Sequence, residues 1–357
     1  NTNVAQQMMK GYMLFPHRRD FRWAALGRGA GTPPEHTSYA FPYAGYVIQR
    51  SGWDADARYL AFDVGPFGAG HQYEDKLSFM LFAYGREFVI NGGTYTYDAS
   101  KWREYVRGPY AQNIVFVDGH GQYRRNIRQT YVTDEPLDYI WVTTDEYDFA
   151  QGSYGNRYEG FGPYRRRFAT HQRSILFVKE GVGKDFWVVV DTLISEDGRA
   201  HEYEAVFHID AEDVEVDPDT YAVRTIYQRG PSLGIFPVRD GRLQSVEVIK
   251  GQEEPFVQGW TATGSHEVKP IPTPIFKFGG DGVQHMLYVF YPVPSGRVGD
   301  VAVLPWDAGH DSDTGIGAEI HFPDGRKYQV FVPTHADAAI EINGEPLSGP
   351  FYLRALE

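Results

Sequence analysis

The chain has 357 residues, a formal net charge of −13 and no cysteine. Without cysteine it has neither disulfide bonds nor cysteine-ligated zinc or iron–sulfur sites. The negative charge argues against nucleic acid as a partner, because phosphate binding needs clustered cations. No apolar run reaches the roughly 18 residues of a membrane-spanning helix, so no membrane span is expected. A hydrophobic fraction of 42% with 23% charged residues is typical of a globular protein.

The N-terminal segment lacks the regular pattern of the rest of the chain. A short helix is predicted around residues 4–14, followed by the basic stretch His17-Arg18-Arg19. Glycine and proline between Gly27 and Pro34 predict a loop. We therefore expect residues 1–40 to form a connecting segment, partly helical and partly irregular.

From Tyr46 onward the pattern is one of short strands separated by tight turns. Residues 77–84 carry apolar side chains at both alternating sets of positions, which is typical of a strand buried on both faces. Dipeptides such as Asn343-Gly344 mark hairpin turns. We therefore expect an all-β fold, a large antiparallel β-sandwich over residues 41–357. Further strands are predicted at 46–49, 59–64, 88–90, 114–117, 139–143, 174–178, 186–190, 203–208, 246–249, 286–291, 318–322, 328–332 and 339–342.

Aromatic and basic residues are the first indications of a ligand. Aromatic side chains make up 15% of the chain. They stack on sugar rings, although packing in the core and across strands explains most of them equally well. Two stretches are locally basic: Lys101 to Arg107, and Arg124-Arg125 followed by Arg128. A solvated strand or loop face is the favoured interpretation of each basic cluster taken alone.

The densest polar and aromatic region runs from Tyr59 to Arg125. His71 follows a glycine-rich turn, and a loop after Asn91 is rich in tyrosine, tryptophan and arginine. Gln112-Asn113 then opens another strand. Taken alone, a histidine beside glycine is more often a structural hydrogen-bonding residue than a catalyst.

The order of these motifs resembles the C-terminal β-sheet domain of the heparinase II/III-like polysaccharide lyases. That family has H-x-H-x-D after a glycine-rich turn, then Asp-x-Gly with a tyrosine-rich loop, then His-Asn opening a strand before a V-D-G turn. This chain has GAGHQYEDKLSF, VINGGTYTYD and YAQNIVFVDGHGQ in the same order. FPYAGYVIQRSGWDADARYLAFD upstream, and HEYEAVFHID and EEPFVQGW downstream, extend the resemblance over roughly residues 40–300.

The resemblance implies cleavage of a uronic-acid-containing acidic polysaccharide by β-elimination. In that reaction a side chain masks the C6 carboxylate, a base removes the C5 proton and an acid protonates the C4 leaving oxygen. Position by position, it implies that His71 and Tyr97 are catalytic, with Tyr105 as the alternative tyrosine of the same loop. The implied substrate-binding residues include two carboxylate clamps; the set is Arg103, Arg107, Trp102 and His120.

The family's metal ligands are replaced together in this chain. Zinc-bearing members use the second His of H-x-H-x-D, the Asp of Asp-x-Gly and the His of His-Asn. The corresponding residues here are Tyr73, Asn91 and Gln112, and all three are poor zinc ligands next to imidazole and carboxylate. We therefore expect no metal and no cofactor, and instead a cluster in which the three side chains hydrogen-bond one another.

Family enzymes also carry an N-terminal α/α-toroid domain that supplies further catalytic residues. Only about 40 residues precede the β segment here. The resemblance therefore implies the C-terminal portion of a lyase, periplasmic or secreted, that needs a helical domain or a companion chain, with an acidic polysaccharide or oligosaccharide as substrate. The alternative is a non-catalytic carbohydrate-binding or scaffold module.

A glycoside hydrolase is a third option, and it needs paired carboxylates. Glu74 and Asp75 are expected to lie on a strand and to point to opposite faces, so they do not form such a pair.

Overall fold

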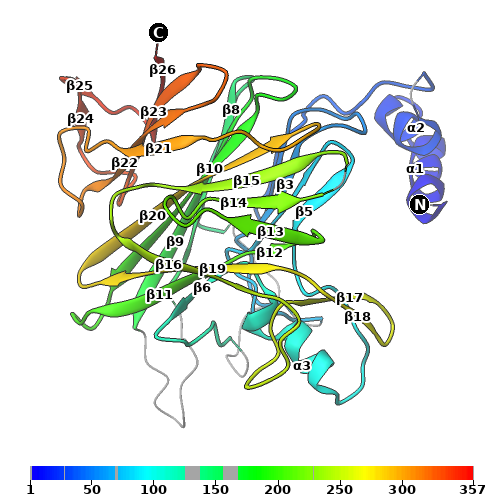
Figure 1. Ribbon diagram of the computed structural model, residues 1–357. Coiled ribbons are helices and arrows are strands. Elements are labelled where there is room, and N and C mark those ends of the chain that lie inside the picture. Colours follow the sequence, from blue (N-terminus) through cyan, green and yellow to red (C-terminus); the bar gives the residue numbers. More distant parts are fainter. Residues whose placement is uncertain are drawn as a thin grey trace.

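The computed structural model describes residues 2–27, 29–68, 71–124, 137–155, 168–227 and 229–356. Strands dominate these residues, which confirms the predicted all-β antiparallel sandwich. Figure 1 shows the strands stacked in layers, with a pair of helices beside them. No helix among the described residues is long and apolar enough to cross a membrane.

An eight-stranded antiparallel sheet forms the middle layer. Its central strands are rich in β-branched and aromatic residues and are buried on both faces, as the run Phe186-Trp-Val-Val-Val190 illustrates. In spatial order the strands are β13 (Asp213–Val216), β14 (Val223–Ile226), β15 (Ser232–Pro237), β20 (Val283–Val293), β10 (Phe186–Ser195), β9 (Ala169–Val178), β8 (Tyr147–Tyr154) and β7 (Ile140–Thr143).

Two further sheets cover one face of this middle layer. Phe79 of the six-stranded sheet and Phe207 both pack against Phe290 of β20, and the Trp187 indole N–H donates to Gln49 Oε1 across the layers at 3.1 Å. The six-stranded sheet runs β1 (Tyr39–Phe41), β2 (Tyr46–Arg50), β3 (Tyr59–Asp63), β4 (Phe79–Ala83), β5 (Arg86–Ile90) and β12 (His208–Ile209). The four-stranded sheet runs β16 (Leu243–Ile249), β19 (Thr273–Gly280), β11 (His201–Val206) and β6 (Val115–Val117).

A second four-stranded sheet covers the opposite face. Phe186, which alternates with Trp187 along β10, packs there against Phe322 and Tyr328. One cluster of buried apolar side chains extends through all of these layers and forms a continuous core. The sheet runs β21 (Ala302–Pro305), β22 (Gly315–His321), β23 (Lys327–Pro333) and β26 (Tyr352–Leu356).

Two short hairpins complete the strands: β17 (Trp260–Gly264) with β18 (Glu267–Pro270), and β24 (Glu341–Ile342) with β25 (Glu345–Pro346). The second is the predicted Asn343-Gly344 hairpin. Its two turn residues have φ of 54° and 81°, the positive values that a two-residue turn of this kind requires.

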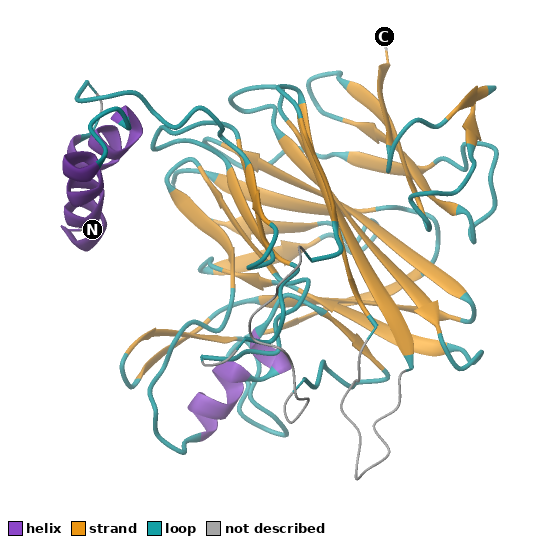
Figure 2. Cartoon of the chain, turned by 180° about the vertical axis from the view of Figure 1, so that it is seen from behind, coloured by secondary structure: helices purple, strands orange, loops and turns teal. Residues whose placement is uncertain are grey.

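The N-terminal segment forms two helices that lie beside the sandwich, as the view from behind shows (Figure 2). Helix α1 (Thr2–Leu14) was predicted, and α2 (Arg19–Leu26) was not. Trp23 of α2 meets Trp53, in the segment after β2, edge to face at 5.9 Å, and both line a groove of about 940 Å³ between the helices and the sandwich.

The loop predicted after Asn91 contains a helix, α3 (Lys101–Arg107), followed by a 3-10 turn, η1 (Pro109–Ala111). Ser100 caps α3, because the Arg103 backbone N–H donates to its hydroxyl oxygen at 3.3 Å. The interpretation of this whole segment as loop was therefore wrong, and the seven-residue helix decides which of its side chains face outward.

Candidate active site

The structure brings His71 and Tyr97 into contact from two different loops. His71 follows β3 and has a φ of 54°, which is uncommon for a residue other than glycine. Tyr97 lies between β5 and α3, and its hydroxyl oxygen is 3.0 Å from His71 Nε2. The rings meet edge to face at 5.7 Å. Both residues are exposed, Tyr97 by 74%, so the pair is open to a ligand.

Arg103 places a positive charge beside this pair. Its guanidinium carbon lies 4.6 Å from the centre of the Tyr97 ring, a cation–π contact. Arg107, one turn further along α3, instead holds the His71 loop: its Nε donates to the Gln72 carbonyl at 3.4 Å, and its own carbonyl accepts from the Glu74 N–H at 3.3 Å. Two of the predicted arginines therefore lie at the site, in different roles.

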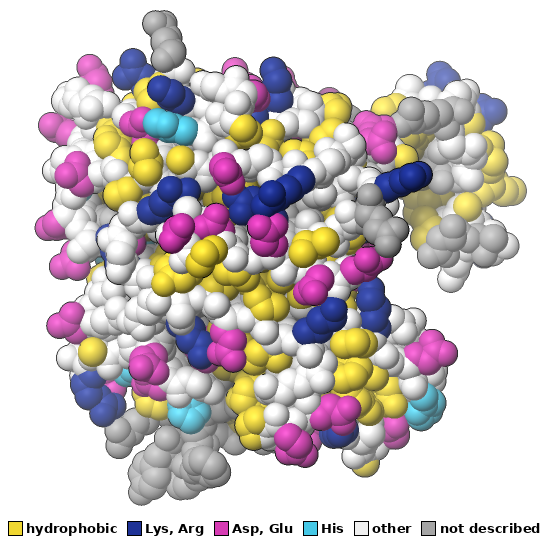
Figure 3. All heavy atoms as spheres, viewed as in Figure 1, with side chains coloured by type: hydrophobic (Ala, Val, Ile, Leu, Met, Phe, Trp, Pro, Cys, Tyr) yellow, Lys and Arg dark blue, Asp and Glu magenta, His cyan; other side chains and the backbone are white. Residues whose placement is uncertain are grey.

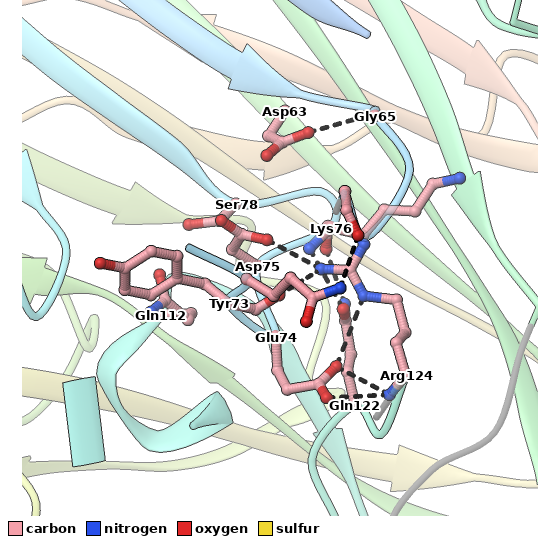
Figure 4. Close-up of polar contacts among 12 residues, drawn as sticks. Asp63, Gly65, Tyr73, Glu74, Asp75, Lys76, Ser78, Gln112, Gln122 and Arg124 are labelled. Carbon is pink, nitrogen blue, oxygen red and sulfur yellow. Dashed lines mark hydrogen bonds and ion pairs between the residues drawn. The ribbon is translucent and has the colours of Figure 1, made fainter. Parts of the chain in front are cut away.

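The segment 72–76, directly after His71 in the chain, is held by contacts with Arg124 and Gln122, as Figure 4 shows. The Arg124 backbone N–H donates to both Glu74 carboxylate oxygens at 2.9 and 2.8 Å. Its Nη2 donates to the Tyr73 carbonyl at 2.7 Å and to Asp75 Oδ1 at 2.8 Å. Gln122 adds a reciprocal pair with the Lys76 backbone, at 3.2 and 2.6 Å.

Two expectations about this region were wrong. Arg124 is only 1% exposed, so it is no part of a solvated basic face; Arg125 and Arg128 lie outside the described residues. Glu74 and Asp75 lie in a loop and not in a strand, so their side chains do not alternate, and both contact Arg124. They are consequently held by an arginine and not presented as a free carboxylate pair.

The ionisable groups near Arg124 have shifted pKa values. Burial, together with the nearby charge of Asp75, raises the pKa of Asp63 to about 8. A hydrogen bond from the Gly65 N–H at 2.7 Å acts in the opposite direction and lowers it. Burial also raises the pKa of Asp75, although Arg124 opposes it. Burial lowers the pKa of Lys76. At neutral pH Asp63 therefore tends to hold a proton, which limits repulsion with Asp75.

The alternative tyrosine, Tyr105, is placed differently. It is 5% exposed, its hydroxyl donates to the Trp260 carbonyl at 2.8 Å, and it accepts from the Trp260 N–H at 3.2 Å. Burial raises its pKa. Helix α3 turns this residue inward, so Tyr97 and not Tyr105 is the tyrosine in contact with His71.

Trp102 and His120, the other predicted substrate-binding residues, pack against other side chains. The Trp102 ring meets that of Trp260 edge to face at 5.0 Å. His120 stacks on Phe168 with ring centres 5.9 Å apart. The residues that come together are therefore His71, Tyr97 and Arg103.

The side chains at the three positions of the family's zinc ligands form hydrogen bonds with three different partners. The Tyr73 hydroxyl lies 3.4 Å from Thr94 Oγ1, Asn91 Oδ1 accepts from the Gly93 N–H at 2.9 Å, and Gln112 Nε2 donates to the Val106 carbonyl at 3.1 Å. The expected bonds among the three side chains are not found. These side chains do not fit zinc, and the described part of the chain has no group of three or more His, Cys, Asp or Glu arranged to hold a metal ion.

Asn113, next to Gln112, links three strands through its side-chain hydrogen bonds, a role that the sequence alone did not reveal. Its side-chain amide donates to the Phe79 and Ile90 carbonyls at 2.8 and 2.7 Å and accepts from the His208 N–H at 2.7 Å. It thereby joins β4, β5 and β12. The only sequence signal was an amide at the start of a strand.

Comparison with known proteins decides the family. The model of the family "Heparinase II/III-like, C-terminal" matches residues 33–270. The chain belongs to this family. Two curated relatives, both named heparin-sulfate lyase, are from Pedobacter heparinus (26% identical over 188 residues) and Bacteroides stercoris (23% over 200 residues). The matches cover 51% and 53% of this chain but only 25% and 26% of the relatives.

Solved structures of family members share the fold. A heparan sulfate lyase from Pedobacter heparinus superposes with a TM-score of 0.74 at 19% identity, covering 94% of this chain and 48% of that one. A structure of heparinase III gives a TM-score of 0.70 at 16% identity, covering 93% of this chain and 49% of that one. This chain thus spans about half the length of these two solved lyase structures.

Proposed function

We propose that this chain is the β-sandwich part of a polysaccharide lyase that cleaves a uronic-acid-containing polysaccharide by β-elimination. The observation that carries the proposal is the exposed contact between His71 Nε2 and the Tyr97 hydroxyl, 3.0 Å apart, beside the Arg103 guanidinium. Family membership and relatives named heparin-sulfate lyase support the same reaction class.

The electrostatics favour an acidic substrate locally although the chain is acidic overall. Acidic and basic side chains are interspersed on the face shown in Figure 3, so an anion must be bound by a local group of cations. Helix α3 carries three cations, Lys101, Arg103 and Arg107, against Glu104. Lys101 is already paired with Glu253 at 2.5 Å, so Arg103 is the cation that the proposal uses. In this proposal Arg103, whose guanidinium carbon lies 4.6 Å from the centre of the Tyr97 ring, pairs with the substrate carboxylate.

The chemistry follows from this arrangement. Masking of the C6 carboxylate by Arg103 makes the C5 proton easier to remove. The electron pair of the broken C5–H bond forms the C4–C5 double bond, while the C4–O bond breaks and its oxygen takes a proton. Tyr97 passes its hydroxyl proton to His71 Nε2, takes the C5 proton as the base, and then gives a proton to the C4 oxygen as the acid, after which His71 and Tyr97 return to their starting protonation. In this proposal a helical domain or companion chain completes the substrate-binding site.

Replacement of His71 tests the proposal. The assay is the ultraviolet absorbance of the new C4–C5 double bond, with heparan sulfate as substrate and with the chain studied within the longest product of its gene. His71→Ala should lower kcat by about a hundredfold or more, because general acid–base groups contribute that much, and Tyr97→Phe should act in the same direction.

The matched control is His335→Ala, since His335 is an exposed histidine in the segment after β23, outside the His71 and Tyr97 loops. It should leave the rate unchanged. Wild-type cleavage that survives in His71→Ala would remove His71 from the mechanism. Saturable binding without turnover by the wild type would instead identify a carbohydrate-binding module.

A further inference from the structure

A second hollow lies on the outer face of the four-stranded sheet β16–β19–β11–β6. Its volume is about 250 Å³, and it shares no lining residue with the group of His71, Tyr97 and Arg103. Pockets for drug-sized ligands measure about 300–1,000 Å³, so this one is sized for a single ring. We call it the Gln258 pocket, after the residue that distinguishes it.

Aromatic rings form one wall of the Gln258 pocket. Tyr110 stacks on Phe256 with ring centres 4.6 Å apart and an angle of 28° between the planes, and it lies 5.0 Å from the ring of Phe116. Phe256 is 39% exposed, so the aromatic stack reaches the surface. A flat, partly exposed aromatic wall suits the apolar C–H face of a sugar ring.

The loop that carries Phe256 is held in place by its own backbone. Gln252 and Gln258 exchange two backbone hydrogen bonds, of 2.9 and 3.0 Å, which close the loop at its base. The Gln252 side chain donates to the Phe256 carbonyl at 3.1 Å, and the Gln252 backbone carbonyl accepts from the Trp260 indole N–H at 2.9 Å. The wall is therefore built before any ligand arrives.

Gln258 supplies the polar half of the pocket. It lines the hollow and is 1% exposed, yet neither its Oε1 nor its Nε2 has a hydrogen-bond partner among the described residues. A buried amide without partners costs free energy that a bound group recovers. One donor and one acceptor on the same amide match neighbouring hydroxyl groups of a sugar.

The charges at the rim select against an anion. Lys277 is already paired, at 3.4 Å from Glu204 and 3.0 Å from Glu247, and all three line the pocket. The rim therefore carries two carboxylates against one ammonium. A uronate or sulfate group would meet net negative charge, whereas a neutral sugar meets additional hydrogen-bonding groups.

We propose that the Gln258 pocket binds one neutral pyranose unit, with its ring on the Phe256–Tyr110 wall and its hydroxyl groups on the Gln258 amide. The inference rests on the proposed function only for the class of ligand, a polysaccharide. The pocket would hold the polysaccharide at a point separate from the site at which it is cleaved.

Ligand-observed NMR with the purified protein tests this. The probes are methyl glucoside and methyl N-acetylglucosaminide as neutral sugars, and glucuronic acid as the anion. The wild type should bind a neutral probe saturably and more tightly than glucuronic acid. Gln258→Leu should bind it roughly tenfold more weakly, the loss expected for two hydrogen bonds. The same variant should be at least as thermally stable as the wild type, because it removes an unsatisfied buried amide.

The matched control is Gln172→Leu, since Gln172 also has a buried amide oxygen without a partner in the described chain but is not among the residues that line the pocket; its binding should equal that of the wild type. Equal binding by Gln258→Leu, no saturable binding of a neutral sugar, or preference for glucuronic acid would overturn the proposal. His71→Ala should bind as the wild type does, so failure of the lyase proposal and failure of this one are distinguishable.

Discussion

Two side chains from separate loops define the proposed chemistry at the scale of single residues. The sequence was sufficient to predict that His71 lies beside the loop that carries Tyr97, because motif order along the chain carries that information, and the two side chains are in contact. The catalytic roles of His71 and Tyr97, and substrate binding by Arg103, stay predictions. The sequence was insufficient to choose between Tyr97 and Tyr105, which lie in one tyrosine-rich segment. The choice depends on α3, which begins at Lys101 and turns Tyr105 toward Trp260.

Tyr105→Phe separates the two tyrosines experimentally. The change removes a hydroxyl that serves both the carbonyl and the N–H of Trp260, leaving these partly buried groups without that partner. Loss of such a bond should lower the free energy of unfolding by about 2 kcal/mol, measured by urea denaturation. Well below its melting temperature the variant should keep the wild-type kcat; a large fall in kcat with unchanged stability would make Tyr105 the reacting tyrosine.

At the scale of elements, the segment between β3 and β4 positions His71. The strand predicted over 77–84 was confirmed in its centre as β4, Phe79–Ala83. The expected alternation of Glu74 and Asp75 failed because Arg124 binds both, and local periodicity carries no information about a partner about 50 residues away in sequence. For the same reason the role of Asn113, whose hydrogen-bond partners lie on three strands, could not be predicted from the sequence.

The Asp63 carboxyl at the end of β3 gives a pH test of this element. Its pKa is raised from 3.8 to about 8 in the folded state, so between these values the folded state binds more protons than the unfolded one. Its contribution to stability is therefore present at low pH and is lost as the pH rises through about 8. Asp63→Asn should match the wild type near pH 4 and melt at a higher temperature near pH 9. Equal melting differences at both pH values, by calorimetry, would contradict the assigned protonation.

At the scale of the whole molecule, the antiparallel sandwich could be predicted because short strands and tight-turn dipeptides recur along the chain. The order of the layers could not be predicted, because contacts between residues far apart in sequence decide which sheet covers each face. Phe186 contacts Phe322 on one side of the middle layer, and Trp187 contacts Gln49 on the other. Helices α2 and α3, of eight and seven residues, were too short for periodicity to identify.

Histidines buried in this core should weaken the fold in acid. Burial lowers the pKa of His208 to about 4 and that of His285 to about 3, both from 6.5. Below pH 6.5 the unfolded state therefore binds more protons, and the free energy of unfolding falls as the pH falls, by up to about 1.4 kcal/mol per unit for each group.

His285→Gln isolates one of these groups. Glutamine has no titrating group, so the slope of unfolding free energy against pH between 6.5 and 4 should be shallower than in the wild type, whatever the variant's absolute stability. Chemical denaturation at several pH values measures the slope, and an unchanged slope would show that His285 does not titrate as burial requires.

The mass of the products tests whether the His71–Tyr97 pair carries out an elimination. Heparan sulfate oligosaccharides of defined size are incubated with the longest product of the gene and analysed by mass spectrometry. Elimination predicts two fragments whose masses sum to that of the substrate, one with a C4–C5 double bond, and their loss in His71→Ala. Fragments that together gain the mass of one water would mean hydrolysis and would contradict the account.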